Sequence, residues 1–166
     1  MNNINFGEEF WKELEAETPA TRKCLERIPE TLYEYKPHEK SMNLGYLALL
    51  VAEIPGWIRD IIEISEIDFA TYNHFKLKDT AALVAHFDNN IAGAKRALQK
   101  VSNEELKDMF YLKNQGHVLF SSTKKENVGS SINHMVHHRG QLTVYMRLNN
   151  IAVPSIYGPS ADERSF

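Results

Sequence analysis

Cysteine is almost absent from this chain, since Cys24 is the only thiol among its 166 residues. A single cysteine excludes an intramolecular disulfide framework, and it excludes the zinc and redox motifs that are built on paired cysteines. This scarcity is typical of proteins of the reducing cytoplasm, so we expect a cytoplasmic location. Any bound metal would therefore depend on histidines and carboxylates.

A long apolar run and an excess of basic residues are also lacking. The longest uninterrupted apolar run is Tyr46–Ala52, whereas a membrane-spanning helix needs about 20 such residues. The N-terminal segment is acidic and has neither the basic nor the apolar region of a signal peptide. With 19 Lys and Arg against 22 Asp and Glu, and with no basic stripe, we expect neither a membrane nor a nucleic acid as partner.

Length and composition are typical of one globular domain, which we expect to span residues 1–166. Domains most often run to about 100–150 residues. The chain is 43% hydrophobic and 25% charged, close to the averages for soluble proteins and sufficient to bury a core.

Apolar residues recur at helical spacing in four long segments, and no alternation of strands and helices interrupts them. The intervals between the first three segments run to about a dozen residues, longer than the 2–8 residues typical of helical bundles. We therefore predict an all-α, four-helix bundle with crossover connections. The predicted helices cover residues 6–28, 42–64, 79–101 and 124–148.

Local signals mark where these helices begin and bend. Ser41 is the predicted N-cap of the second helix, and Thr123 with Glu126 forms a capping box before the last one. Pro55 interrupts the second helix while its apolar period continues in phase, so we predict a kink there and not a break.

The segments between the helices carry weaker patterns. Residues 66–78 show no sustained period and are predicted to form a connection. In residues 110–122, apolar groups flank the sequence Asn114-Gln115-Gly116, which predicts a short β-hairpin or an extended excursion before the last helix.

Three histidines fall within five consecutive positions of the last helix, and two of them lie one turn apart. His134 and His138 share a face at the i, i+4 spacing at which two imidazoles can converge on one metal ion. The glutamate that follows the first histidine in metalloprotease motifs is missing, and a catalytic zinc needs about three protein ligands. The alternative is a pair of half-buried or solvated histidines without a metal.

The neighbours of this pair carry further expectations. His137 lies on the opposite side of the helix and is expected to be solvated. Arg139 falls at the edge of the apolar sector, where an arginine should be paired or reach a partner surface. Gly140 costs the helix about 1 kcal/mol relative to Ala, which predicts close approach of another backbone across a helix or subunit contact. We assign structural or surface roles to the remaining motif-free residues Cys24, His38, His74, His86 and His117.

Two stretches of the sequence resemble one family of helical proteins. The run His134–Glu163, HMVHHRGQLTVYMRLNNIAVPSIYGPSADE, resembles the C-terminal signature of the DNA-damage-inducible DinB-like (DinB/YfiT-type) family. Lys36–Ile58 resembles the segment that leads into and along the second helix of the same family. The resemblance implies a four-helix bundle with crossover connections and, commonly, a homodimer packed through helices.

The resemblance also implies a divalent metal, often zinc or nickel. In the family one histidine of the second helix and two of an HxxxH motif on the last helix hold this ion. The last-helix pair falls on His134 and His138, whereas Leu50 occupies the position of the third ligand. Either the two histidines bond to each other, to Tyr145 or to water, or a substitute ligand completes a weakened site.

Two functional hypotheses follow from the missing ligand. We favour a DinB-like protein derived from metal-dependent enzymes, with a degenerate site and little or no catalysis, that acts through dimerisation or a small-molecule ligand near His134 and His138. The alternative is an active metal-dependent hydrolase or thiol-dependent transferase, in line with what the resemblance implies. Its third ligand would be Glu53, His38 or water. Neither hypothesis assigns a catalytic residue.

Overall fold

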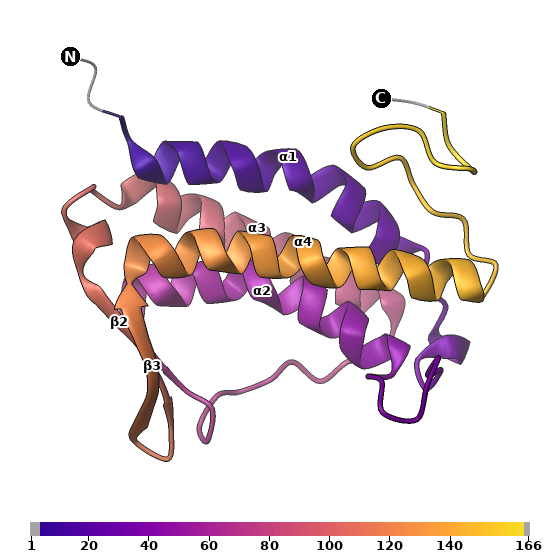
Figure 1. Cartoon of the computed structure of the whole chain (residues 1–166), viewed down its shortest axis with the longest axis horizontal. Helices are drawn as coiled ribbons and strands as arrows, with labels where there is room; N and C mark the ends of the chain where they lie inside the picture. The colour runs from indigo at the N-terminus through magenta and orange to yellow at the C-terminus, as the bar shows by residue number, and fades with distance from the viewer. Residues whose placement is uncertain (1–3, 165–166) are drawn as a thin grey trace.

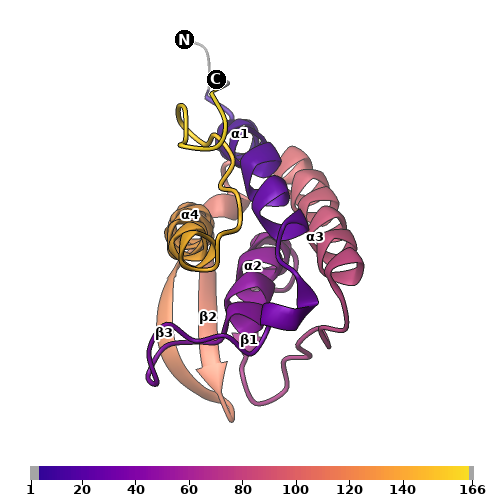
Figure 2. The ribbon, with the colours of Figure 1, turned by 90° about the vertical axis from the view of Figure 1, so that its right-hand side faces the viewer.

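Figure 1 shows the computed structural model of the protein, which describes residues 4–164. The four long helices lie side by side and a small sheet flanks one end of them (Figures 1 and 2). None of the helices in residues 4–164 combines the length and the apolar character needed to cross a membrane. The elements are α1 (Phe6–Glu26), a 3₁₀ turn (Glu30–Leu32), α2 (Leu44–Ile64), β1 (Glu66–Asp68), α3 (Thr80–Lys100), a second 3₁₀ turn (Glu105–Lys107), β2 (Met109–Asn114), β3 (His117–Thr123) and α4 (Lys124–Leu148).

The four predicted helices are confirmed, and α2 is the most deeply buried of them. Fourteen of the 21 residues of α2 are buried. It packs mainly against α3 and α4, while α1 covers α3 and α4 from the other side and hardly touches α2. Burial of each large aliphatic side chain in this core contributes about 1.5–3 kcal/mol. The crossover course of the connections stays a prediction.

The beginning of α2 differs from the prediction. Asn43, and not Ser41, is the N-cap, because its side-chain oxygen accepts the backbone N–H of Tyr46 at 2.8 Å. Asn and Ser are about equally good caps, so the sequence alone does not decide between two neighbouring candidates. Ser41 lies in the preceding turn, where its N–H donates to the carbonyl of His38 at 2.9 Å.

The helix continues through Pro55 without a break, as predicted. A proline removes one backbone donor and displaces a carbonyl of the preceding turn. Asn90 of α3 donates its side-chain N–H to the Ala52 carbonyl of this turn at 2.9 Å. Gly56 makes the approach possible, since a Cβ at this position would lie 2.8 Å from Oδ1 of Asn90. A bend at Pro55 stays a prediction.

The capping box at the beginning of α4 is confirmed. The Thr123 hydroxyl accepts the N–H of Glu126 at 3.2 Å, and the Glu126 carboxylate accepts the N–H of Thr123 at 3.0 Å. These bonds satisfy donors that the first helical turn otherwise leaves free. The apolar stripe of α4 is buried in the core and consists of Val128, Ile132, Met135, Leu142 and Met146.

The predicted hairpin is confirmed, but the sheet contains a third strand that the sequence did not indicate. The strand order is β1-β2-β3, with β1 parallel and β3 antiparallel to β2. Gln115 and Gly116 form the hairpin turn with positive φ angles of 51° and 79°. The Asp68 carboxylate accepts the N–H groups of both residues at 3.0 and 2.7 Å, and these hydrogen bonds lower the pKa of Asp68. The end of β1 therefore fixes the hairpin turn.

The buried Arg139 connects α4, α1 and the C-terminal segment. Its side chain is 2% exposed and forms an ion pair with Glu17 at 2.5 Å. One guanidinium nitrogen also donates to the Thr21 hydroxyl at 3.0 Å, and the other donates to the Tyr157 hydroxyl at 2.9 Å. The predicted pairing of Arg139 is confirmed, within the chain.

The predicted close approach of another backbone to Gly140 is wrong within residues 4–164. A Cβ at this position would meet no atom of the described residues within 4 Å, so no neighbouring helix approaches it closely. Gly140 is exposed on α4, and a contact with another subunit at this position stays a prediction.

Replacing Arg139 by Ala should lower the free energy of unfolding by about 3 kcal/mol, because the largely buried Glu17 carboxylate loses its charged partner. Urea denaturation followed by circular dichroism measures this loss. The matched control is Arg147→Ala, which removes an ion pair with Asp162 from the surface of the same helix and should cost less than about 1 kcal/mol. Equal losses in the two variants would contradict this assignment.

Candidate functional site

His134 and His138 lie together on α4, as their spacing predicts, and they bond to each other. Their Nε2 atoms are 2.8 Å apart. His138 is buried and donates its Nδ1–H to the side-chain oxygen of Gln141 at 2.7 Å. Its Nε2 therefore carries a lone pair, which accepts the Nε2–H of His134. The ring of His134 lies 5.7 Å from that of Trp57 on α2.

The surroundings of this pair disfavour protonation of His134. Partial burial lowers the pKa of His134 below its ordinary value of 6.5, and His138 and His137 lower it further. Tyr145 does not take part, since its hydroxyl donates to the Met42 carbonyl at 3.2 Å. Of the predicted partners of the two histidines, which were each other, Tyr145 and water, the structure shows the first. His137 is exposed, as expected.

A third metal ligand does not join the pair from residues 4–164. Within this range, no group of three or more His, Cys, Asp or Glu side chains is arranged to hold a metal ion. Leu50 is a hydrocarbon that packs against the core. His38 is exposed, and its Nδ1 accepts the N–H of Lys40 at 3.1 Å. The protein side chains present therefore do not fit the three-ligand set of a catalytic zinc.

Glu53, the other substitute ligand that we considered, binds a different part of the chain. Its side chain is 6% exposed. One carboxylate oxygen accepts the backbone N–H of Phe75 at 2.9 Å, and the other accepts Nδ1–H of His74 at 3.3 Å. His86 of α3 lies 3.9 Å from the same carboxylate, and its ring stacks on Phe75 with centroids 4.1 Å apart. Glu53 thus anchors the segment between β1 and α3 to the helices.

Sequence reasoning missed this cluster. The histidines at 74 and 86 belong to no motif, and residues 66–78 show no period that would place them. The one available signal was an acidic residue, Glu53, in the middle of an apolar helix, where a carboxylate must find buried hydrogen-bond donors.

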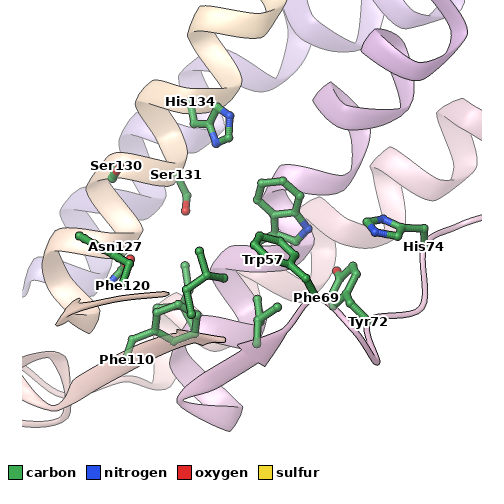
Figure 3. Close-up of a pocket in the computed structure, with 13 residues that line it drawn as sticks. Trp57, Phe69, Tyr72, His74, Phe110, Phe120, Asn127, Ser130, Ser131 and His134 are labelled. Carbon is green, nitrogen blue, oxygen red and sulfur yellow. The ribbon is translucent and has the colours of Figure 1, made fainter. Parts of the chain in front are cut away.

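A cavity of about 280 Å³ lies between α2, α4 and the sheet (Figure 3). This volume is near the lower end of the about 300–1,000 Å³ of small-molecule pockets. His134 and Ser131 reach into it from α4, while His74 lies on the far side beyond Trp57 (Figure 3). Its walls are largely aromatic and include Trp57, Phe69, Tyr72, Phe110 and Phe120. The sequence could not show this cavity, because strands that pair only in the folded chain build part of its wall.

Comparison with known proteins identifies the family of this fold. The sequence model of the DinB family matches residues 1–165. A DinB-like protein of Bacillus subtilis has a similar structure, with a TM-score of 0.69 at 18% identity over 95% of this chain and 99% of that one. A DinB-like protein of Bacillus cereus gives a TM-score of 0.70 at 21% identity over 90% and 97% of the two chains. A further DinB family structure, from Exiguobacterium sibiricum, gives 0.68 at 12% identity over 92% and 97%.

Among curated proteins the similarity is local. The uncharacterized protein YrdA of Bacillus subtilis (strain 168) is 56% identical over 32 residues, which is 19% of each chain. The match therefore spans about a fifth of the length of this relative. Similarity at these levels describes the fold and brings no activity with it.

Acidification should destabilise the protein through His134. The folded state lowers the pKa of His134 below 6.5. At a pH between the folded and the unfolded pKa, the unfolded chain therefore binds more protons than the folded protein. The free energy of unfolding should therefore fall as the pH drops through about 6.5 toward the folded pKa. Burial lowers the pKa of His86 in the same direction. Melting temperatures at about pH 7.5 and about pH 5.5 measure the effect.

The variant His134→Gln should show a smaller drop in melting temperature than the parent over this range. His117→Gln changes an exposed histidine at the beginning of β3 and should behave like the parent. If His134→Gln and the parent lose the same stability, the lowered pKa of His134 would not be the cause.

Proposed function

The chain belongs to the DinB family, and on this premise we propose that it is a non-catalytic protein that binds a small molecule beside a degenerate divalent-metal site. The observation that carries the proposal is the aromatic cavity with His134 at its edge. In this proposal His134 and His138 are the two remaining ligands of an ancestral site for zinc or nickel. Leu50 stands where the third ligand was lost.

The hydrogen bond between the two histidines supports the degenerate site. The two Nε2 atoms are 2.8 Å apart and share a hydrogen bond, so each occupies the position that a metal ion between them would need. An incoming metal must break this hydrogen bond and finds two protein ligands, one fewer than a catalytic zinc uses. A weakly held ion does little to lower the pKa of a bound nucleophile. We therefore expect the protein to have little or no metal-dependent catalytic activity.

The character of the cavity supports binding of an apolar molecule. Aromatic rings line it, and a few polar groups, among them Ser131, Asn127 and His134, lie along α4. Mostly apolar walls with a small number of placed polar groups are typical of ligand sites. Burial of apolar ligand surface contributes about 25 cal/mol per Å².

The alternative function is a metal-dependent hydrolase or thiol-dependent transferase in which water completes the ligand set. The convergence of the Nε2 atoms of His134 and His138 next to the cavity favours this alternative. The homodimer, the cytoplasmic location and the absence of nucleic-acid and membrane partners stay predictions from the sequence.

The variant Leu50→His should bind zinc at least about tenfold more tightly than the parent, because it restores a third ligand. Calorimetric titration of protein without a histidine tag measures this affinity. The variant that also carries His138→Ala should lose the gain. No gain in Leu50→His would show that position 50 is not the third ligand, and a stoichiometric ion in the parent that is lost in His138→Ala would support the alternative enzyme.

Para-nitroanisole, an apolar aromatic probe without a hydrogen-bond donor, should bind to the parent in equilibrium dialysis. Ser131→Leu fills space in the cavity. It should weaken binding of the probe about tenfold or more, because the probe loses apolar contact with the cavity walls. Thr143→Leu adds a similar side chain to the same helix away from the cavity and should bind like the parent. Absence of binding to the parent, or equal affinity in both variants, would contradict the proposed function.

A further inference from the structure

Resting on the proposed binding function, we propose that Glu53 and His74 form a carboxylate–histidine dyad that accepts a proton from the hydroxyl group of an aromatic ligand in the cavity. The ligand class is therefore a phenol, and the protein binds it as the anion.

The dyad combines a fixed carboxylate with an accessible imidazole. The backbone N–H of Phe75 holds one oxygen of the buried Glu53 carboxylate, and His74 donates Nδ1–H to the other. This hydrogen bond sets the tautomer, so Nε2 of His74 carries a lone pair. Its side chain is 52% exposed, and no hydrogen bond within residues 4–164 engages this nitrogen. The free nitrogen can accept a proton from a ligand.

The position of His74 directs this acceptor to the cavity. His74 lines the cavity, and its ring extends from the backbone toward Trp57 (Figure 3). Tyr72 meets the ring edge-on with centroids 5.1 Å apart. Two side chains therefore restrain the imidazole, Glu53 through a hydrogen bond and Tyr72 through packing. A ligand ring against Trp57 brings its hydroxyl toward His74.

The proton transfer is balanced without a further reactant. The O–H bond of the ligand breaks, an N–H bond forms at Nε2 of His74, and the electron pair stays on the ligand oxygen. The carboxylate of Glu53 stabilises the imidazolium that forms, as the buried carboxylates of catalytic histidine pairs do. The imidazolium in turn is the positive partner that an anion needs in an apolar cavity.

The other titratable groups around the dyad do not compete with it. Burial lowers the pKa of His86 on α3, so this histidine stays neutral beside Glu53. Burial, Asp60 and Glu53 raise the pKa of Tyr72 to about 12. The Tyr72 hydroxyl thus keeps its proton, and because the same burial and carboxylates act on a bound phenol, only a phenol far more acidic than tyrosine gives up its proton here. Asp60 is engaged by Arg59 at 2.7 Å.

A phenol matches these features better than an aliphatic alcohol does. The aromatic walls favour a flat ring. Proton transfer to an imidazole is efficient only from a hydroxyl far more acidic than that of an alcohol. A phenol with an electron-withdrawing substituent meets this requirement.

Para-nitrophenol tests the inference because its anion and its neutral form absorb at different wavelengths. The parent protein is titrated with this probe at a pH below the pKa of the free phenol, where the free probe is mostly neutral. For the bound probe, the ratio of anion to neutral form should be at least about tenfold higher than in solution, which corresponds to one pKa unit. A probe that binds but stays neutral would overturn the dyad and leave the cavity function standing.

Variants locate the proton acceptor. His74→Gln should bind para-nitrophenol only in its neutral form. His117→Gln removes an exposed histidine outside the cavity and should ionise the bound probe to the same extent as the parent. Glu53→Gln should ionise it less than the parent. If Glu53→Gln does not fold, His74→Gln decides between the outcomes. Ionisation of bound para-nitrophenol that persists in His74→Gln would overturn the inference. Failure of both para-nitrophenol and para-nitroanisole to bind the parent would overturn the proposed function as well.

Discussion

The burial of α2 is the constraint on which the rest of the structure depends. This helix lies against both α3 and α4 and is buried along most of its length. Its polar groups must therefore find partners inside the protein. Glu53 does so by binding His74 and the backbone of Phe75, which draws the segment between β1 and α3 back over the helix. The same segment forms one side of the cavity, so a requirement of folding also builds the candidate site.

Helix α2 also borders the histidine pair, since the ring of Trp57 lies 5.7 Å from that of His134. Leu50 of α2 adds to the apolar packing and has no polar atom that could bind a histidine or a metal ion. His134 and His138 satisfy each other instead, with Gln141 fixing the tautomer of the inner ring. A histidine pair that is closed by its own hydrogen bond and lies at the edge of an aromatic cavity is suited to contact a ligand. In the proposed function this pair contacts the ligand and holds no ion.

Local patterns in the sequence predicted those features that depend on neighbours along the chain. The helical periods, the Thr123 capping box, the hairpin and the shared face of His134 and His138 are all of this kind. What the sequence did not show depends on distant partners: β1 is three residues long and pairs in parallel with β2, and Glu53 meets His74 across 21 positions. The prediction of the α2 N-cap was wrong for a different reason, since Ser41 and Asn43 are equally suitable caps.

The central claim is that the cavity beside His134 holds a small molecule and that the histidine pair is closed to a metal. The most direct measurement is a crystal structure of the protein grown with para-nitroanisole and zinc, with anomalous data collected at the zinc edge. We predict density for the probe against Trp57 and no stoichiometric anomalous peak between His134 and His138. A fully occupied zinc bound by both Nε2 atoms, with the cavity free of the probe, would contradict the claim.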